Sequence, residues 1–119
     1  MQACRAQAEL LKVLAHPTRL YILEILSQGE ACVCHLTAII GRRQANVSQH
    51  LMALREAGLV RDRRDGVLVY YRLADQRIPE IITTLCQTAY PEKGIERPKV
   101  PASPVPGCPC PKCKSYEVN

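Results

Sequence analysis

The stretch from Ala31 to Leu59 constrains the fold most, because it has the pattern of two short helices joined by a tight turn. Its first half carries apolar residues at helical spacing, namely Val33, Leu36, Ile39 and Ile40. Gly41 then stands where a left-handed residue would end a helix, and Gly58 follows the second half in the same way. The stretch therefore predicts a helix-turn-helix unit.

The second half of this unit, which starts near Gln44, combines an apolar stripe with a polar surface. Val47, Leu51 and Leu54 form the stripe. Gln and Asn side chains both donate and accept hydrogen bonds, which matches the edge of adenine in the major groove. We expect a recognition helix whose groove-facing residues are Gln44, Asn46, Ser48, Gln49 and His50. An ordinary helical hairpin with a polar outer face is the alternative for this stretch taken alone.

A β-hairpin is predicted directly after the second helix. Residues 59–63 and 67–73 are rich in β-branched and aromatic side chains, and Arg64-Asp65-Gly66 lies between them. Asp-Gly between two such runs is a strong hairpin signal. A helix-turn-helix followed by this hairpin predicts a winged helix.

Positive charge gathers on the same two elements. Residues 42–72 contain seven arginines, no lysine and three acidic residues, a local balance of +4. Phosphate contacts supply much of the affinity for DNA, whereas base contacts select the site. We expect Arg63 and Arg64 of the hairpin to contact phosphate or the minor groove. A solvated basic face is the alternative.

Residues from about Glu9 to Leu73 resemble the ArsR/SmtB family of metal-responsive winged-helix repressors. The resemblance rests on LLKVLAHPTRLYILEIL, ACVCHL, QANVSQHLMALREAGLV and VYYRL, which occur in this order. It implies a mainly α winged helix-turn-helix with a small β-hairpin, in a homodimer that leaves a palindromic double-stranded operator when an inducer binds. It also implies that the helix of residues 78–85 mediates dimerisation. The family's zinc or nickel site on that helix needs histidines, and none follows His50.

Cys32 and Cys34 flank Val33 at the start of the first predicted helix. A helix N-terminus favours the thiolate, which is the form that binds soft ions. In the family this motif is the inducer site of arsenic-sensing and cadmium/lead-sensing members. We therefore predict that the pair binds a soft inducer ion, either As(III)/Sb(III) or Cd(II), Pb(II) or Zn(II). Two small buried hydrophobic residues without a ligand role are the alternative.

The pair needs further ligands, because As(III) takes three thiolates and the divalent ions take three or four soft ligands. Arsenic-sensing members have a third cysteine one helical turn on, where this chain has Thr37. His35 offers a nitrogen, but we expect it on another side of the helix. Cys4 is preferred, because cadmium/lead-sensing members bring N-terminal cysteines to the pair, often from the partner subunit. An idle thiol at Cys4 is the alternative.

The composition changes at Pro91, and seven of the nine prolines lie in the last 29 residues. Such a stretch predicts an extended, mobile tail (91–119) after a DNA-binding and dimerisation domain (1–90). The tail contains CPCPKC, with Cys108, Cys110 and Cys113. These thiols could bind one trigonal ion, complete the Cys32/Cys34 site or pass metal to it. Exposed thiols that simply oxidise are the alternative.

The remaining sequence properties narrow the class of protein. The chain has 119 residues, seven cysteines and a formal net charge of +5, with no 18-residue apolar run and no signal-peptide pattern. We expect a single-domain cytoplasmic protein with no membrane partner, whose cysteines bind metal or sense redox state. The strand-helix-strand setting of redox dithiol enzymes is absent, so we expect no enzyme. Other possibilities are a repressor that senses oxidants or reactive sulfur, and a cysteine-tailed metal-buffering protein.

Overall fold

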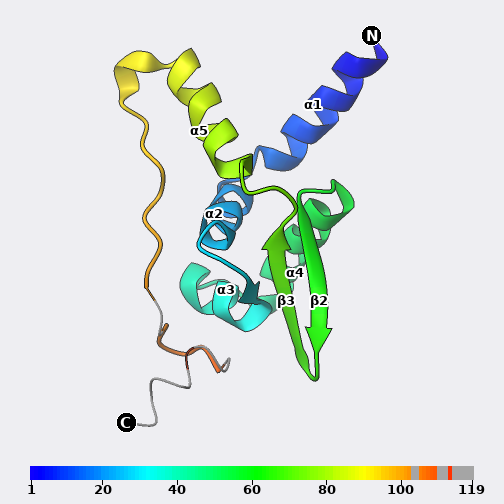
Figure 1. The fold of residues 1–119 in the computed structure, drawn as a ribbon, viewed down its shortest axis with the longest axis vertical. Helices are drawn as coiled ribbons and strands as arrows, with labels where there is room; N and C mark the ends of the chain where they lie inside the picture. Colours follow the sequence, from blue (N-terminus) through cyan, green and yellow to red (C-terminus); the bar gives the residue numbers. More distant parts are fainter. Residues whose placement is uncertain (103–104, 110–112, 114–119) are drawn as a thin grey trace.

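The computed structural model describes residues 1–102, 105–109 and 113. Within these residues, five α-helices and three strands follow one another in the order expected of a winged helix (Figure 1). The helices are α1 (Gln2–Leu14), α2 (Pro17–Leu26), α3 (Val33–Ile40), α4 (Gln44–Glu56) and α5 (Ile78–Ala89). The strands are β1 (Ala31–Cys32), β2 (Val60–Asp65) and β3 (Leu68–Leu73), and a 3-10 turn, η1 (Pro91–Lys93), follows α5.

The helix-turn-helix prediction is confirmed in α3 and α4. Gly41 ends α3 in the left-handed conformation, with φ 74°. Gly58 follows α4 with φ 79°, also in the left-handed region. A side chain at either position would be strained, so these glycines fix where the two helices stop.

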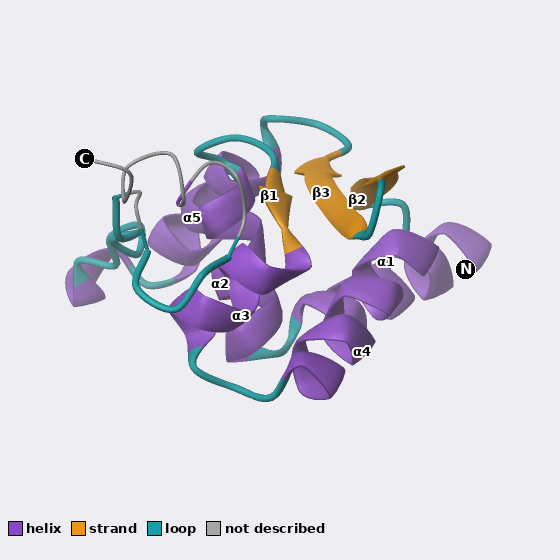
Figure 2. Cartoon of the chain, turned by 90° about the horizontal axis from the view of Figure 1, so that it is seen from below, coloured by secondary structure: helices purple, strands orange, loops and turns teal. Residues whose placement is uncertain are grey.

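The wing is an antiparallel sheet with strand order β1-β3-β2. The prediction of a hairpin is confirmed, but its turn is shifted along the chain, because β2 continues to Asp65, which pairs with Leu68, and Gly66 and Val67 form the turn. The strand β1 was not predicted. Its pairing of Cys32 with Tyr70 joins the start of α3 to the wing (Figure 2).

Aliphatic side chains form the core, and α2 lies at its centre. Ile22, Leu23 and Leu26 of α2 are fully buried. They pack with buried residues from the helix-turn-helix and the sheet, among them Leu36, Leu51, Leu54, Val60 and Leu73. The stripe predicted on α4 therefore faces the core, which turns the polar side of α4 outward.

The helices α1 and α5 project together from the end of the molecule opposite α3 and the wing tip (Figure 1). Leu11 of α1 is 52% exposed, and Ile81 and Leu85 of α5 are 58% and 56% exposed. Ile78 and Ile82, on another side of α5, pack against the core. Among the described residues, no helix is both long and apolar enough to cross a bilayer.

The segment after η1 has no secondary structure over residues 94–102 and runs from α5 back along α2 toward α3 (Figure 1). Two contacts attach it to α2. Arg97 forms an ion pair of 2.6 Å with Glu24, whose carboxylate is nearly buried, and the Tyr21 hydroxyl donates to the Lys99 carbonyl at 3.2 Å. The buried charge of Glu24 is thus compensated by the C-terminal segment.

Candidate DNA-binding face and cysteine cluster

The outer surface of α4 presents most of the residues predicted for base contacts. Gln44, Asn46 and Gln49 are exposed, and Ser48 is half-buried. Val47, Leu51 and Leu54 on the same helix are fully buried. This division leaves amide side chains toward solvent on a helix that the core holds rigidly.

The structure places His50 differently from its four neighbours. Its ring is half-buried, and its Nδ1 accepts a hydrogen bond of 2.9 Å from Nε of Arg19. The ring of His16 lies 5.8 Å away, centroid to centroid. Burial, together with the positive charge of Arg19 and the neighbouring His16, lowers the pKa of His50. His50 therefore ties α4 to the loop before α2 and to α2 itself.

The two wing arginines also differ. Arg63 donates from Nε to both carboxylate oxygens of Glu30, at 3.0 and 2.9 Å, and its guanidinium lies 4.4 Å from the ring centroid of Tyr70. The hydrogen bond from Arg63 lowers the pKa of Glu30. Arg64 is exposed. Arg63, although exposed, is thus engaged within the protein, on the edge strand β2.

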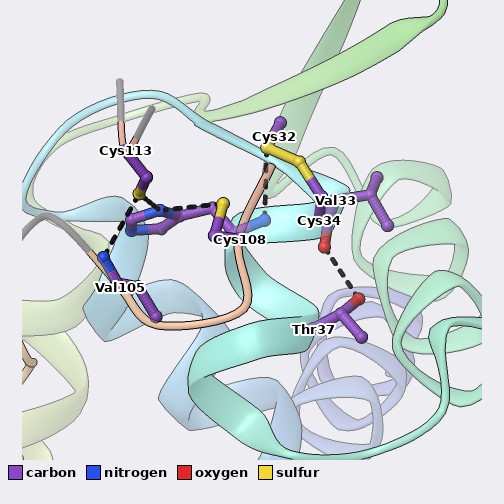
Figure 3. Close-up of a disulfide and its surroundings, with 8 residues drawn as sticks. Cys32, Val33, Cys34, Thr37, Val105, Cys108 and Cys113 are labelled. Atoms are coloured by element: carbon purple, nitrogen blue, oxygen red, sulfur yellow. Dashed lines mark hydrogen bonds between the residues drawn. A yellow bond between two sulfur atoms is a disulfide. The ribbon is translucent and has the colours of Figure 1, made fainter. Parts of the chain in front are cut away.

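A second feature surrounds the start of α3. Cys32 caps this helix, and its Sγ accepts a hydrogen bond of 3.2 Å from the backbone N–H of His35. Cys32 and Cys34 are joined by a disulfide, with their Cα atoms 5.3 Å apart (Figure 3). Their sulfur atoms are therefore adjacent, and two electrons with two protons would convert them into a pair of thiols.

The C-terminal segment covers this pair. Val105, Cys108 and Cys113 are buried and form one apolar cluster with Cys32. The sulfur atoms of Cys32, Cys34 and Cys108 lie within 4.8 Å of one another (Figure 3). Three soft donors at this spacing are compatible with one ion.

His35 contributes a donor that the sequence analysis placed on another side of the helix. Its ring is buried, and Nδ1 lies 3.4 Å from Sγ of Cys113 and 3.8 Å from Sγ of Cys108. Nothing in the sequence indicated that cysteines near the C-terminus would lie beside this ring. The C-terminal segment passes over that side of α3. Cys108 and Cys113 follow His35 by 73 and 78 positions in the sequence, and no spacing rule relates residues so far apart.

The other cysteines lie apart from this cluster. Cys4 is an exposed residue of α1, and Cys86 of α5 is half-buried. Neither belongs to a group of possible metal ligands among the described residues. Cys110, which was predicted as a ligand, lies outside the described residues.

Comparisons with known proteins agree with this architecture. Residues 16–62 match the model of the family described as "Bacterial regulatory protein, arsR family". An uncharacterised HTH-type transcriptional regulator of Methanocaldococcus jannaschii is 37% identical over 83 residues, covering 69% of this chain and 93% of that protein. The arsenical resistance operon repressor of Escherichia coli is 48% identical over 67 residues, covering 56% and 57%. The biofilm growth-associated repressor of Agrobacterium fabrum is 46% identical over 78 residues, covering 66% and 67%.

Solved structures of related proteins share the same fold. The crystal structure of M. tuberculosis Rv0081 matches with TM-score 0.69 and 35% identity, over 76% of this chain and 92% of that one. A homodimeric winged helix-turn-helix domain from Mycobacterium bovis, described as a possible ArsR-family regulator, matches with TM-score 0.67 and 29% identity, over 80% and 92%. The fold and the order of elements are therefore those of DNA-binding regulators.

Proposed function

Because this chain belongs to the ArsR family of transcriptional regulators, we propose that it is a repressor released from its operator when a soft ion binds Cys32, Cys34 and Cys108. The family assignment makes it a DNA-binding repressor and not an enzyme. The observation that carries the inducer site is the meeting of three sulfur atoms within 4.8 Å of one another.

A homodimer is the assembly that we propose. The projecting helices α1 and α5 expose Leu11, Ile81 and Leu85, which a second copy of the chain would bury. The winged helix-turn-helix relative from M. bovis is described as homodimeric. A two-fold dimer places one α4 in each half-site, which accounts for a palindromic operator. Residues 1–90 would serve DNA binding and dimerisation, and residues 91–119 would carry regulation.

For DNA recognition we propose that α4 enters the major groove. Gln44, Asn46 and Gln49 are exposed there, and Ser48 is close enough to the surface to join them. Arg64 would contact phosphate from the wing. Arg63 would do so only after exchanging Glu30 for phosphate, and His50 would hold the helix in position.

The proposed inducer binds only the reduced cysteines. Reduction of the Cys32–Cys34 disulfide takes two electrons and two protons and yields two thiols, which lose these protons when they ligate an ion. Together with Cys108 they supply three thiolates, the pyramidal set that As(III) or Sb(III) takes. Cd(II), Pb(II) or Zn(II) would use the same set with a further ligand. Cys4 of the partner subunit is the alternative third thiolate.

The coupling to DNA starts at Cys32. This residue caps α3 and pairs with Tyr70 of the wing through β1. A ligand that draws the sulfur of Cys32 toward Cys108 would therefore act on both parts of the DNA-binding face. A coupling free energy of ~3 kcal/mol changes operator affinity ~150-fold. By reciprocity, operator DNA must weaken ion binding by the same factor.

The test is operator release under anaerobic, reducing conditions, on a duplex selected from a random pool by the metal-free protein. As(III), Cd(II), Pb(II) and Zn(II) are added separately, and affinity is measured by fluorescence anisotropy. We expect ~150-fold weaker binding with the cognate ion, and no change in the variant Cys32→Ser/Cys34→Ser. Cys86→Ser is the matched control. Release that persists in the double variant would refute the proposed site, and a larger loss for Cys4→Ser than for Cys108→Ser would identify Cys4 as the third ligand.

A second candidate function is redox sensing, which the Cys32–Cys34 disulfide favours. In that case formation of the disulfide, with loss of two electrons to an oxidant, would change operator affinity without any metal. Hydrogen peroxide in chelator-treated buffer is the discriminating reagent. A shift in affinity that reductant reverses would favour the redox sensor, and no shift would favour the ion sensor.

A further inference from the structure

Three side chains of types that bind metal meet where the C-terminal segment crosses α3, and none of them belongs to the Cys32/Cys34 pair. His35 is 5% exposed, Cys108 is 4% exposed and Cys113 is fully buried. Their donor atoms lie within 4.8 Å of one another. We propose that His35, Cys108 and Cys113 form a second metal site, for Zn(II), that fastens the C-terminal segment to α3.

The donor spacing fits a zinc ion. Zn–S bonds of ~2.3 Å and Zn–N bonds of ~2.05 Å in a tetrahedron place nitrogen and sulfur ~3.6 Å apart. Nδ1 of His35 lies 3.4 Å from Sγ of Cys113 and 3.8 Å from Sγ of Cys108, one distance on each side of that value. An ion slightly above the plane of the three donor atoms, as in a tetrahedron, needs only small movements of side chains. Water or another ligand would complete the tetrahedron.

Charge and hydrogen bonding favour the same ion. Two buried thiolates without a cation would be costly to desolvate, whereas Zn(II) with two thiolates and a neutral imidazole has no net charge. Sγ of Cys113 also accepts a hydrogen bond of 3.3 Å from the backbone N–H of Val105. Such outer-shell donors orient a ligating sulfur and stabilise its negative charge.

The site differs from the proposed inducer site in its dependence on redox state. When Cys32 and Cys34 form a disulfide they have no thiolates to offer, but the three ligands of the second site are unaffected. The two sites share Cys108, so an inducer bound to all three thiolates of the first site would compete with zinc for it. Zinc would therefore occupy the site in the oxidised protein, and zinc and a three-thiolate inducer would antagonise each other.

The test uses the full-length chain with Cys32→Ser/Cys34→Ser, which lacks the proposed inducer pair but keeps the second site. Co(II) is titrated first, because its thiolate charge-transfer and d–d bands report the ligands and geometry, and Zn(II) is then used to displace it. We expect one ion per chain. Adding Cys113→Ser should weaken binding more than ~100-fold, because even outer-shell changes cost 10–100-fold. Adding Cys86→Ser is the matched control and should change nothing.

Two further measurements identify the ligands without substituting the buried His35, a change that could prevent folding. X-ray absorption of the zinc-loaded double variant should show one imidazole nitrogen and two sulfur ligands. Zinc should also protect Cys108 and Cys113 from alkylation, while Cys4 stays reactive. Absence of binding, a shell without nitrogen, or binding unchanged by Cys113→Ser would each overturn the second site. None of these outcomes bears on the inducer site, which is tested separately by operator release in the wild-type protein and in Cys32→Ser/Cys34→Ser.

Discussion

The DNA-binding face and the cysteine cluster are built in different ways. The helix α4 and the hairpin β2–β3 are neighbours in sequence, and their buried apolar residues belong to the main core. The cysteine cluster joins the start of α3 to Cys108 and Cys113, through a small separate group of side chains. These two cysteines follow His35 by 73 and 78 positions in the sequence. The first region is fixed by burial of aliphatic surface. The second contains a disulfide, and under the proposals made for it the cluster would also depend on ligation of its sulfur atoms.

This contrast predicts unequal costs for removing buried carbon atoms. Leu51→Ala, in α4, should lower the free energy of unfolding by about 2–5 kcal/mol, because Leu51 is fully buried in the main core. Val105→Ala, in the cysteine cluster, should cost only about 1.6 kcal/mol, since two buried carbons contribute ~0.8 kcal/mol each. Urea unfolding in reducing, chelator-treated buffer measures both.

The same measurement with saturating Zn(II) sharpens the comparison. Zinc should raise the midpoint of the Val105→Ala variant, because a ligand that binds only the folded state stabilises it. Equal costs for the two substitutions without metal would show that the cysteine cluster is an integral part of the main core and not a separate group of side chains.

The DNA-binding face could be predicted because its signals are local. Gly41, the apolar stripe of α4 and the Asp65-Gly66 pair each act within a few residues, and each prediction of an element was confirmed. Helix α4 begins at Gln44, as expected. The error at the wing turn was also local, because Arg64 and Asp65 both pair in β2 and the turn starts at Gly66, two residues later than expected.

The cysteine cluster could be predicted only in part. The motif around Cys32 indicated soft-ion chemistry, but the strand β1 is only two residues long and depends on pairing with β3. The position of His35 beside Cys113 follows from how the C-terminal segment crosses α3, which tertiary contacts such as Arg97 with Glu24 decide. Sequence spacing carries no signal for such contacts.

On the DNA-binding face, Gln49→Ala should weaken operator binding by about 1–3 kcal/mol, because a lost bidentate base contact has that cost. Affinity for nonspecific DNA should not change, since the contact carries sequence information only. Anisotropy titrations on the operator and on a scrambled duplex measure both effects. Met52→Ala, at another exposed position of α4, is the matched control. An equal loss on both duplexes would show that Gln49 contacts the backbone instead.

The two wing arginines should differ in their salt dependence. Arg64→Gln should reduce the slope of log affinity against log salt by ~1, because one phosphate contact releases about one counterion. Arg63→Gln should change the slope less, since Glu30 already neutralises Arg63 in the free protein. Titrations over a salt series give both slopes. A larger change for Arg63 would mean that it leaves Glu30 for phosphate on the operator.

The smallest expected effect concerns His50, on the protein side of α4. Its folded-state pKa is lowered from 6.5, chiefly by burial and then by Arg19 and His16. Below pH 6.5 the unfolded chain therefore binds a proton that the folded chain resists, so stability is complete above this pH and falls as pH decreases toward the folded-state pKa. His50→Gln, which keeps an acceptor for Arg19, should flatten this part of the stability profile, measured by thermal unfolding across the range. It should also leave operator affinity nearly unchanged, because Arg19 already occupies the ring nitrogen Nδ1. A large loss of operator affinity with an unchanged pH profile would instead put His50 in the groove with Gln49.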